Sequence, residues 1–488
     1  MWSGLMLRVL CAILMFGAWF NLGLVLARRL AFPYALEWME GGMLQHVERL
    51  RQGLELYGAP NPDFTPFPYP PLFPLMASWL PGESWSFLGP RLLALVGHAG
   101  VCVCLWAIAR QRGLASNARA LGASVYAAGY AFSGGWYDVA RADGWALFLS
   151  LAGVVFLWGK GGRGRAVAAG VLFLLAGLAK QIGWPLGILL SVAYSVERKP
   201  GARELWATWF VGAVGLYFWV PAVLGERAYF YIFEVLSGHE VALDGPALGA
   251  KFVVLLPGWL LGLWLVVRAC KARESAPMWV ALFVGWGLVT LMGVVHLGAY
   301  DNVYLPALVA AAFAAMMGLG LAERWYGRNG VATRVVLGLV VMQLAALTYD
   351  RRPWIPTDGY RARMECVEEE IAASSEPMFA PGHGYLLERH GLASGFHWMA
   401  LFDLSATGDG QVGVQLVERV RDRLEAGDYP RALCDRSADG LDLSGWLEGF
   451  YGKRRVLELP EGEGGMPLPP SGAPWFASEI LTEPVGGG

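Results

Sequence analysis

The sequence has little charge. Only 16% of its 488 residues are Asp, Glu, Lys or Arg, whereas 56% are hydrophobic and the mean hydropathy is +0.43. Soluble proteins carry about 25% charged residues, so this composition predicts a membrane protein. The formal net charge of −2 provides no general attraction for nucleic acid, and we expect no nucleic-acid partner.

The sequence also lacks the motifs that hold nucleotides or structural zinc. It has no P-loop, no Gly-x-Gly-x-x-Gly after a predicted strand, no His-Glu-x-x-His and no paired Cys-x-x-Cys. Six cysteines are present, and two of them, Cys366 and Cys434, fall in the polar C-terminal third. That pair could form a disulfide if the region is extracytoplasmic, but its spacing does not decide the matter.

Apolar runs are what the sequence has in abundance. A span needs about 20 apolar residues, and the first run, from Gly4 to Ala27, meets that length and lacks a small-residue cleavage site. We therefore expect a retained first helix. The apolar segments predict about 11 transmembrane helices, near 5–27, 88–109, 115–134, 143–158, 166–179, 181–196, 205–223, 252–267, 278–295, 303–322 and 333–348.

Basic residues alternate in density between successive loops, and cytoplasmic loops are the ones enriched in Lys and Arg. The rich loops contain Arg110 and Arg112; Lys160, Arg163 and Arg165; Arg198, Lys199 and Arg203; Arg268, Lys271 and Arg273; and Arg324, Arg328 and Arg334. The opposite loops hold isolated cations, namely Arg141, Lys180, Arg227 and Lys251. This asymmetry predicts a cytoplasmic N-terminus and an extracytoplasmic C-terminal region.

Three parts follow from this topology. Residues 1–349 form a transmembrane domain whose first loop, 28–87, lies outside the cytoplasm. Residues 350–460 read as a small extracytoplasmic α/β domain, with helices in "YRARMECVEEEIAAS" and "VQLVERVRDRLEAG" and strands in "PMFAP" and "RVLEL". Residues 461–488 are rich in Gly and Pro and predict a loose tail.

The first loop opens with two carboxylates in "ALEWMEGGM". Apolar residues recur at helical spacing from Leu36, so Glu40 would lie about 40° from the centre of the apolar stripe and Glu37 about 100° from it. Glu40 is then partly desolvated, and Glu37 is turned farther towards water. Alternatively, both glutamates simply solvate the start of an amphipathic helix that lies on the membrane or packs on the spans.

Several ordered motifs follow these carboxylates. They are Glu40-Gly41, Gly53 to Tyr57, Tyr69-Pro70-Pro71-Leu72, "RADGWALFLSLAG" (Arg141 to Gly153), "AGLAKQIGWPL" (Ala176 to Leu186) and "AYDNVYLPAL" (Ala299 to Leu308). Over roughly the first 320 residues, their order resembles GT-C fold membrane glycosyltransferases. The resemblance is to the bacterial, family 39-related branch of protein O-mannosyltransferases and lipid A aminoarabinose transferases. The family's adjacent Asp-Glu pair is absent, and Met39-Glu40 stands in its place.

The resemblance implies an enzyme of the bacterial inner membrane that moves a sugar from a polyprenyl-phosphate donor to a lipid, glycan or protein acceptor, with inversion. An acceptor hydroxyl needs a carboxylate to take its proton, and a leaving phosphate needs cations. Glu40 is the first candidate base and Glu37 the second. Arg141 and Lys180 are candidate phosphate ligands, although either could instead snorkel or pair with Asp138 or Asp143.

Other candidates for substrate binding follow from the same motifs or from the outer loops. Asp143 could orient Arg141 or cap its helix, and Tyr69 belongs to the Pro-Pro-Leu motif. His296, Asp301 and Asn302 share an outer loop and could meet acceptor or carrier, or be structural. We expect no obligatory metal, although Glu37 and Glu40 could share a divalent cation.

Two other classes of function remain open from the sequence. A lipid or glycan transporter or flippase would line a pathway with charge and show inverted repeats, and no convincing repeat is visible. A non-catalytic envelope assembly protein could share the same fold. The test that separates them is whether Glu40 or Glu37 lies within hydrogen-bonding range of a cavity that also presents Arg141 or Lys180.

Overall fold

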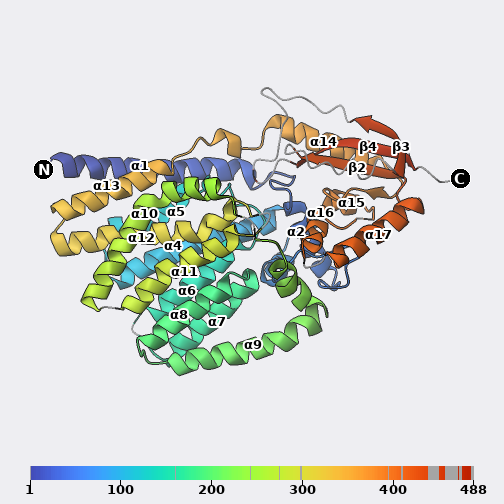
Figure 1. The fold of residues 1–488 in the computed structure, drawn as a ribbon. Helices are drawn as coiled ribbons and strands as arrows, with labels where there is room; N and C mark the ends of the chain where they lie inside the picture. The colour runs from blue at the N-terminus through green and yellow to red at the C-terminus, as the bar shows by residue number, and fades with distance from the viewer. Residues whose placement is uncertain are drawn as a thin grey trace.

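The computed structural model describes residues 2–159, 161–241, 243–273, 275–296, 299–393, 395–407, 410–437, 450–456, 471 and 475–484. Helices dominate, in a long bundle that carries an α/β part at one end (Figure 1). The bundle helices are α1 (Trp2–Arg29), α4 (Leu88–Gln111), α5 (Ser116–Ala128), α6 (Asp143–Leu157), α7 (Arg163–Ala179), α8 (Gly183–Val196), α9 (Ala202–Leu224), α10 (Gly245–Ala272), α11 (Ala276–Val294), α12 (Leu305–Tyr326) and α13 (Val331–Ala346).

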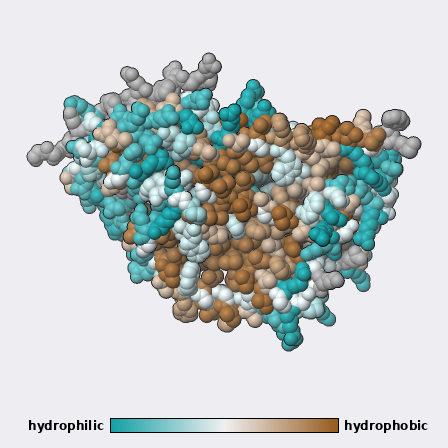
Figure 2. Space-filling model, turned by 180° about the vertical axis from the view of Figure 1, so that it is seen from behind, coloured by the Kyte–Doolittle hydropathy of each residue, from teal (hydrophilic) through white to brown (hydrophobic). Residues whose placement is uncertain are grey.

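These helices coincide with the predicted apolar segments, as expected for a multi-pass membrane protein. Among the described residues, α1, α4, α9, α10, α11 and α12 are long and apolar enough to cross a membrane, while α6, α8 and α13 are shorter apolar helices. Large apolar side chains such as Phe210 and Phe218 on α9 are exposed. Figure 2 shows a broad apolar surface between hydrophilic ends, which is the pattern a lipid-facing belt requires.

Helix α12 lies in the interior of the bundle and packs against α5, α10, α11 and α13. Its sequence, rich in Ala and Gly, keeps its side chains small, so neighbouring helices approach closely. A methyl group added at Gly129, beside α5, would lie 2.2 Å from the Leu308 side chain of α12. Close packing of this kind explains why α12, although long and apolar enough to cross a membrane, faces protein and not lipid.

The first extramembrane loop contains two helices, α2 (Glu40–Arg51) and α3 (Leu72–Ser78). The sequence predicted a helix from Leu36, but α2 begins four residues later. The cause is local, because the Glu40 side chain accepts a hydrogen bond from the Leu36 amide and the Glu40 amide bonds the Glu37 carbonyl, closing a turn. His46 of α2 is buried and accepts the Phe67 amide N–H at 2.8 Å.

The C-terminal part contains both helices and strands. It contains α14 (Asp358–Ala372), α15 (Gly384–Arg389), α16 (Trp398–Ser405), α17 (Gln411–Glu425), β1 (Met378–Phe379), β2 (Arg431–Ser437), β3 (Tyr451–Val456) and β4 (Trp475–Pro484). The strand order is β1-β2-β4-β3, with β1 parallel to β2 and the other pairs antiparallel. Strand β4 lies within the segment predicted to be a loose tail, so that prediction is wrong for residues 475–484.

Helix α2 packs directly against the C-terminal part of the molecule. A methyl group at Gly41 would lie 2.4 Å from the Tyr385 ring of α15, and one at Gly42 would lie 2.4 Å from the Phe67 ring. The Gly-Gly pair therefore allows the C-terminal part to sit directly on the loop that follows α1. Cys366 and Cys434 cannot be compared, because the side chain of Cys434 is outside the described residues.

Candidate active site

Glu40 is a buried structural clamp. Its Oε1 accepts hydrogen bonds from Arg91 Nε at 2.8 Å and from the Ala140 amide at 2.9 Å. Its Oε2 accepts from Arg91 Nη2 and from the Leu36 amide, both at 2.7 Å. A carboxylate has about four lone-pair sites, and all four are used here. Glu40 therefore ties α4 and two loops together, with no oxygen lone pair left to accept a substrate proton.

Glu37 is buried without such partners. Among the described residues, neither of its carboxylate oxygens has a hydrogen-bond partner of ordinary geometry, and the Arg141 cation lies beside it, with Nη1 3.8 Å from Oε2. Burial raises the pKa of the Glu37 carboxyl to about 7, although Arg141 and the Met39 amide oppose the rise. The expectation that Glu37 faces water is wrong, because the chain turns before α2 begins and directs this residue inward.

Arg141 precedes α6 and is held by aromatic residues. Its Nη2 donates to the Tyr69 hydroxyl at 3.1 Å, and its guanidinium lies 5.0 Å from the Tyr69 ring and 5.6 Å from the Trp136 ring. Burial disfavours the charge, but Tyr69, Glu37 and Asp143 raise the pKa of Arg141 above its ordinary value. The residue is therefore a fixed cation.

A second cation site lies where α6 begins and α7 ends. Lys180 Nζ is 2.5 Å from Asp143 Oδ1, and Asn302 Nδ2 donates to the same oxygen at 3.1 Å. Asp143 thus pairs with Lys180, which was one of the alternatives left open by the sequence. The next residue, Gln181, donates to the carbonyls of Pro68 and Ile232, so the α7–α8 turn is fixed to the first loop.

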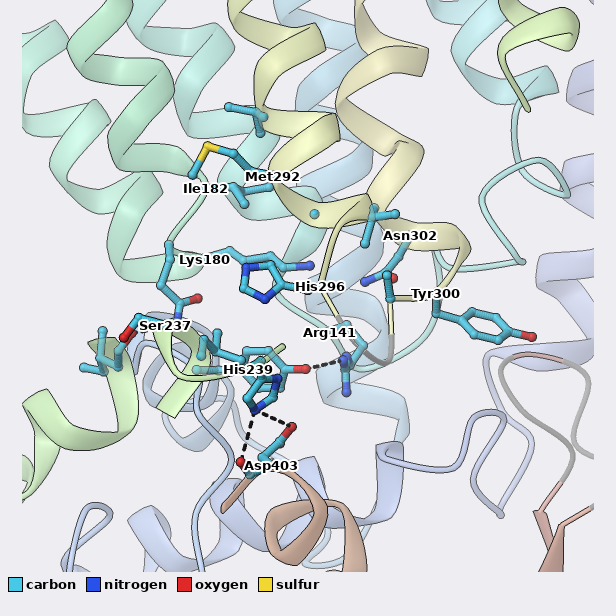
Figure 3. A pocket seen from close by; sticks show the side chains of 18 of the residues that line it. Arg141, Lys180, Ile182, Ser237, His239, Met292, His296, Tyr300, Asn302 and Asp403 are labelled. Atoms are coloured by element: carbon cyan, nitrogen blue, oxygen red, sulfur yellow. Dashed lines mark hydrogen bonds and ion pairs between the residues drawn. The ribbon is translucent and has the colours of Figure 1, made fainter. Parts of the chain in front are cut away.

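These groups border a cavity of about 510 Å³ between the helix bundle, the first loop and α16. Figure 3 shows Arg141, Lys180, His296 and Asp403 around it. Five predicted site residues line the cavity, namely Tyr69, Arg141, Lys180, His296 and Asn302. Asp143 lines a small adjoining pocket together with Lys180 and Arg141. Glu37 lines neither of these two cavities, and its link to the site is Arg141, whose Nη1 is 3.8 Å from its carboxylate.

Two predicted residues serve other contacts. Asp301 pairs with Lys251 of α10 at 2.8 Å, and Glu40 is bound to Arg91. Neither lines the cavity, since their carboxylates are turned to other elements. Both residues are close in sequence to residues of the site, but neither side chain reaches the cavity.

The cavity also contains residues that the sequence did not single out. His239, which follows the π-helix η1 (Phe230–Val235), lines it together with Asp403 of α16. Burial raises the pKa of Asp403 to about 8 against the opposing effect of Arg141, and burial lowers the pKa of His239. A signal was present, because Asp403 is a lone acid in the apolar stretch "FHWMALFDL", but nothing in the sequence connects it to Arg141.

Aromatic side chains form a further wall of the cavity. Trp38 and Trp136 both contact Tyr300, with ring centroids 5.3 and 5.6 Å apart. Among the described residues, no group of three or more His, Cys, Asp or Glu side chains is arranged to hold a metal ion. A cation shared by Glu37 and Glu40 would have to displace the hydrogen bonds that already occupy Glu40.

The sequence matches no protein-family model and no curated protein. The structure is similar to that of ArnT from Cupriavidus metallidurans bound to undecaprenyl phosphate, with a TM-score of 0.56, 13% identity and coverage of 98% of this chain and 97% of that one. It is also similar to an Archaeoglobus fulgidus oligosaccharyltransferase in the apo form, with a TM-score of 0.50, 10% identity and coverage of 88% and 69%. At such identities the likeness shows the fold alone, and it confirms the predicted GT-C fold.

Proposed function

We propose that this protein is a membrane glycosyltransferase that moves a sugar from a polyprenyl-phosphate donor to an acceptor on the extracytoplasmic side, with inversion. One observation carries the proposal. Arg141 and Lys180, which lie in different loops, line the same cavity, and the unpartnered carboxylate of Glu37 lies 3.8 Å from Arg141. Two cations and a carboxylate are what the transfer needs.

The two cations hold the carrier phosphate. Both are at the end of the bundle next to the C-terminal part, where a lipid headgroup would be found, and apolar residues of α8 and α11, such as Ile188 and Met292, continue the cavity wall. An isoprenoid chain fits such a wall because it is wholly apolar. The similar ArnT structure is bound to undecaprenyl phosphate, which supports this class of donor.

Glu37, and not Glu40, is the base in this proposal. The acceptor hydroxyl gives its proton to Glu37 as its oxygen bonds to the anomeric carbon. The bond between that carbon and the phosphate oxygen breaks, and its electron pair leaves with the carrier phosphate. A carboxylate with a pKa raised to about 7 by burial is a stronger base than an exposed one, whereas the four hydrogen bonds to Glu40 leave it no site for a proton.

The location follows from the same reasoning. With the basic loops in the cytoplasm, the cavity and the C-terminal part lie on the outer side of a bacterial inner membrane. The acceptor, whether lipid, glycan or protein, would reach the cavity from that side.

Mass spectrometry of cell-envelope lipids and glycans tests the proposal. A strain without the protein should lack one sugar on an envelope component, and the gene should restore it, whereas the Arg141→Ala and Lys180→Ala double variant should not. Identical envelopes in all strains would contradict a transferase. Accumulation of a complete polyprenyl-linked glycan on the cytoplasmic side would point to a flippase instead.

A further inference from the structure

The cavity has a second buried carboxyl that comes from the C-terminal part of the chain. Asp403 of α16 lines the cavity and is more than nine-tenths buried. Figure 3 shows its side chain directed towards His239 on the side of the cavity opposite the bundle helices. The transfer proposed above uses Glu37, Arg141 and Lys180, and it gives Asp403 no role.

The backbone of Asp403 is firmly held. Its carbonyl accepts a hydrogen bond from Thr407 Oγ1 at 2.7 Å and is 3.1 Å from His239 Nε2. Because burial lowers the pKa of His239, its ring is neutral and Nε2 carries the proton that it donates. These contacts join α16 to the loop before α10 and fix the position of the Asp403 backbone, from which its side chain extends.

Within the part of the chain that the structure describes, the carboxyl itself has no hydrogen-bond partner. The His239 ring is beside it, with Nε2 3.8 Å from Oδ1. Arg141 is the charge that acts on it most strongly, yet among the described residues no ion pair within 4.0 Å joins Arg141 to Asp403. A buried acid and a fixed cation therefore line one cavity without forming an ion pair, and an anion bound between them would contact both.

We propose that Asp403 binds the phosphate of the polyprenyl-phosphate donor from the side opposite Arg141 and Lys180, so that the C-terminal part of the chain completes the donor site. The inference rests on the proposed function, because it uses the same cavity and the same class of donor. Asp403 is a binding residue in this arrangement, and Glu37 remains the base.

A carboxyl contacts a phosphate favourably only if it is protonated. Burial raises the pKa of Asp403 to about 8, so the group is neutral at pH 7, and a bound anion favours that state further. The groups that face it are His239 from the loop before α10, Arg141 from the loop before α6 and Tyr69 from the first loop. A carboxylic O–H donating to a phosphate oxygen is among the stronger hydrogen bonds in proteins.

Binding of radiolabelled undecaprenyl phosphate to the full chain in nanodiscs tests the inference. At pH 7 we expect Asp403→Ala to weaken binding by about tenfold, the effect of losing one hydrogen bond to a charged group, and Asp403→Asn to keep it within about threefold because its amide still donates. From pH 7 to pH 9 the native protein should lose affinity, whereas Asp403→Asn should lose much less. Asp428→Asn, an exposed carboxylate of the same part of the chain, is the matched control.

The outcomes separate this inference from the proposed function. If the carrier binds, Arg141→Ala removes the binding and both Asp403 variants behave as the native protein does at every pH, the role of Asp403 is overturned while the donor site stands. If the native protein does not bind the carrier, both proposals fail. Equal pH dependence in the native protein and Asp403→Asn would also overturn the role, because the carrier phosphate alone would then account for the titration.

Discussion

The Arg141 guanidinium lies 3.8 Å from the Glu37 carboxylate, close enough for charge attraction but without a hydrogen bond between them. The next glutamate along the chain, Glu40, is bound to Arg91 through two hydrogen bonds of 2.7 and 2.8 Å. The Glu37 carboxylate is therefore buried beside a cation without a hydrogen bond to it, whereas the Glu40 carboxylate holds the fold. The predictions below follow from this difference.

Glu40→Gln should destabilise the protein. The substitution removes the negative charge from a fully buried pair and leaves Arg91 as an uncompensated buried cation, which costs about 3 kcal/mol or more. The unfolding transition in detergent should move to a clearly lower temperature. Glu83→Gln, at an exposed position of the same loop, should unfold as the native protein does. Equal stability of the two variants would show that Glu40 is not a clamp.

The variants Arg141→Lys and Arg141→Ala should separate the contribution of the Arg141 charge to carrier binding from that of its guanidinium geometry. Lysine keeps the cation but cannot reproduce the contacts with Tyr69 and Trp136, so we expect carrier binding to weaken by about tenfold. Alanine removes the charge and should weaken binding by about 100-fold. Affinity for undecaprenyl phosphate measures both, and unchanged affinity in Arg141→Ala would place the phosphate elsewhere.

Sugar transfer should depend on pH in a bell-shaped manner. Glu37 must be ionised to accept a proton, so the rate should rise as the pH passes through about 7, the pKa to which burial raises this group. Asp403 must be protonated to donate, so the rate should fall as the pH passes through about 8. A pH series at subsaturating donor measures both limbs, and Asp403→Asn should lose the alkaline limb. A flat profile would contradict both assignments.

Gly41→Ala should weaken the contact between α2 and the C-terminal part. The added methyl group would lie 2.4 Å from the Tyr385 ring, so the ring or the helix must move, at a cost of about 1–3 kcal/mol. Thermal unfolding in detergent should show the loss. Gly17→Ala is the matched control, because a methyl group on α1 at that position meets nothing within 4 Å. Equal unfolding temperatures of the two variants would show that the interface accommodates the added methyl group without loss of stability.

Hydropathy alone predicts where the bundle helices of this chain lie, since a long apolar run is stable in a membrane only as a helix. It does not reveal which of the two glutamates is held by hydrogen bonds. The start of α2 depends on a hydrogen bond from the Leu36 amide to the Glu40 side chain, and the burial of Glu37 depends on residues that are distant in sequence. Helical periodicity from Leu36 therefore put Glu37 on the wrong side.

Arg141 and Lys180 were found because isolated cations are unusual in outer loops. Nothing in the sequence connects Asp403 or His239 to Arg141, because only the folded chain brings α16 and the segment after η1 to the same cavity. Strand β4 was missed because the Gly- and Pro-rich residues around it dominate the composition, whereas its partners β2 and β3 are supplied by earlier segments. Local sequence patterns do not reveal contacts between segments that are distant in sequence.

The most direct measurement is sugar transfer per folded molecule in native, Glu37→Gln, Glu40→Gln and Glu83→Gln membranes supplied with the same polyprenyl-phosphate sugar. We predict that Glu37→Gln folds normally and loses at least about 100-fold in rate, the usual effect of removing a general base. The folded fraction of Glu40→Gln should still transfer sugar, and Glu83→Gln should match the native protein. Native-like turnover in Glu37→Gln, or loss of turnover confined to correctly folded Glu40→Gln, would contradict the account.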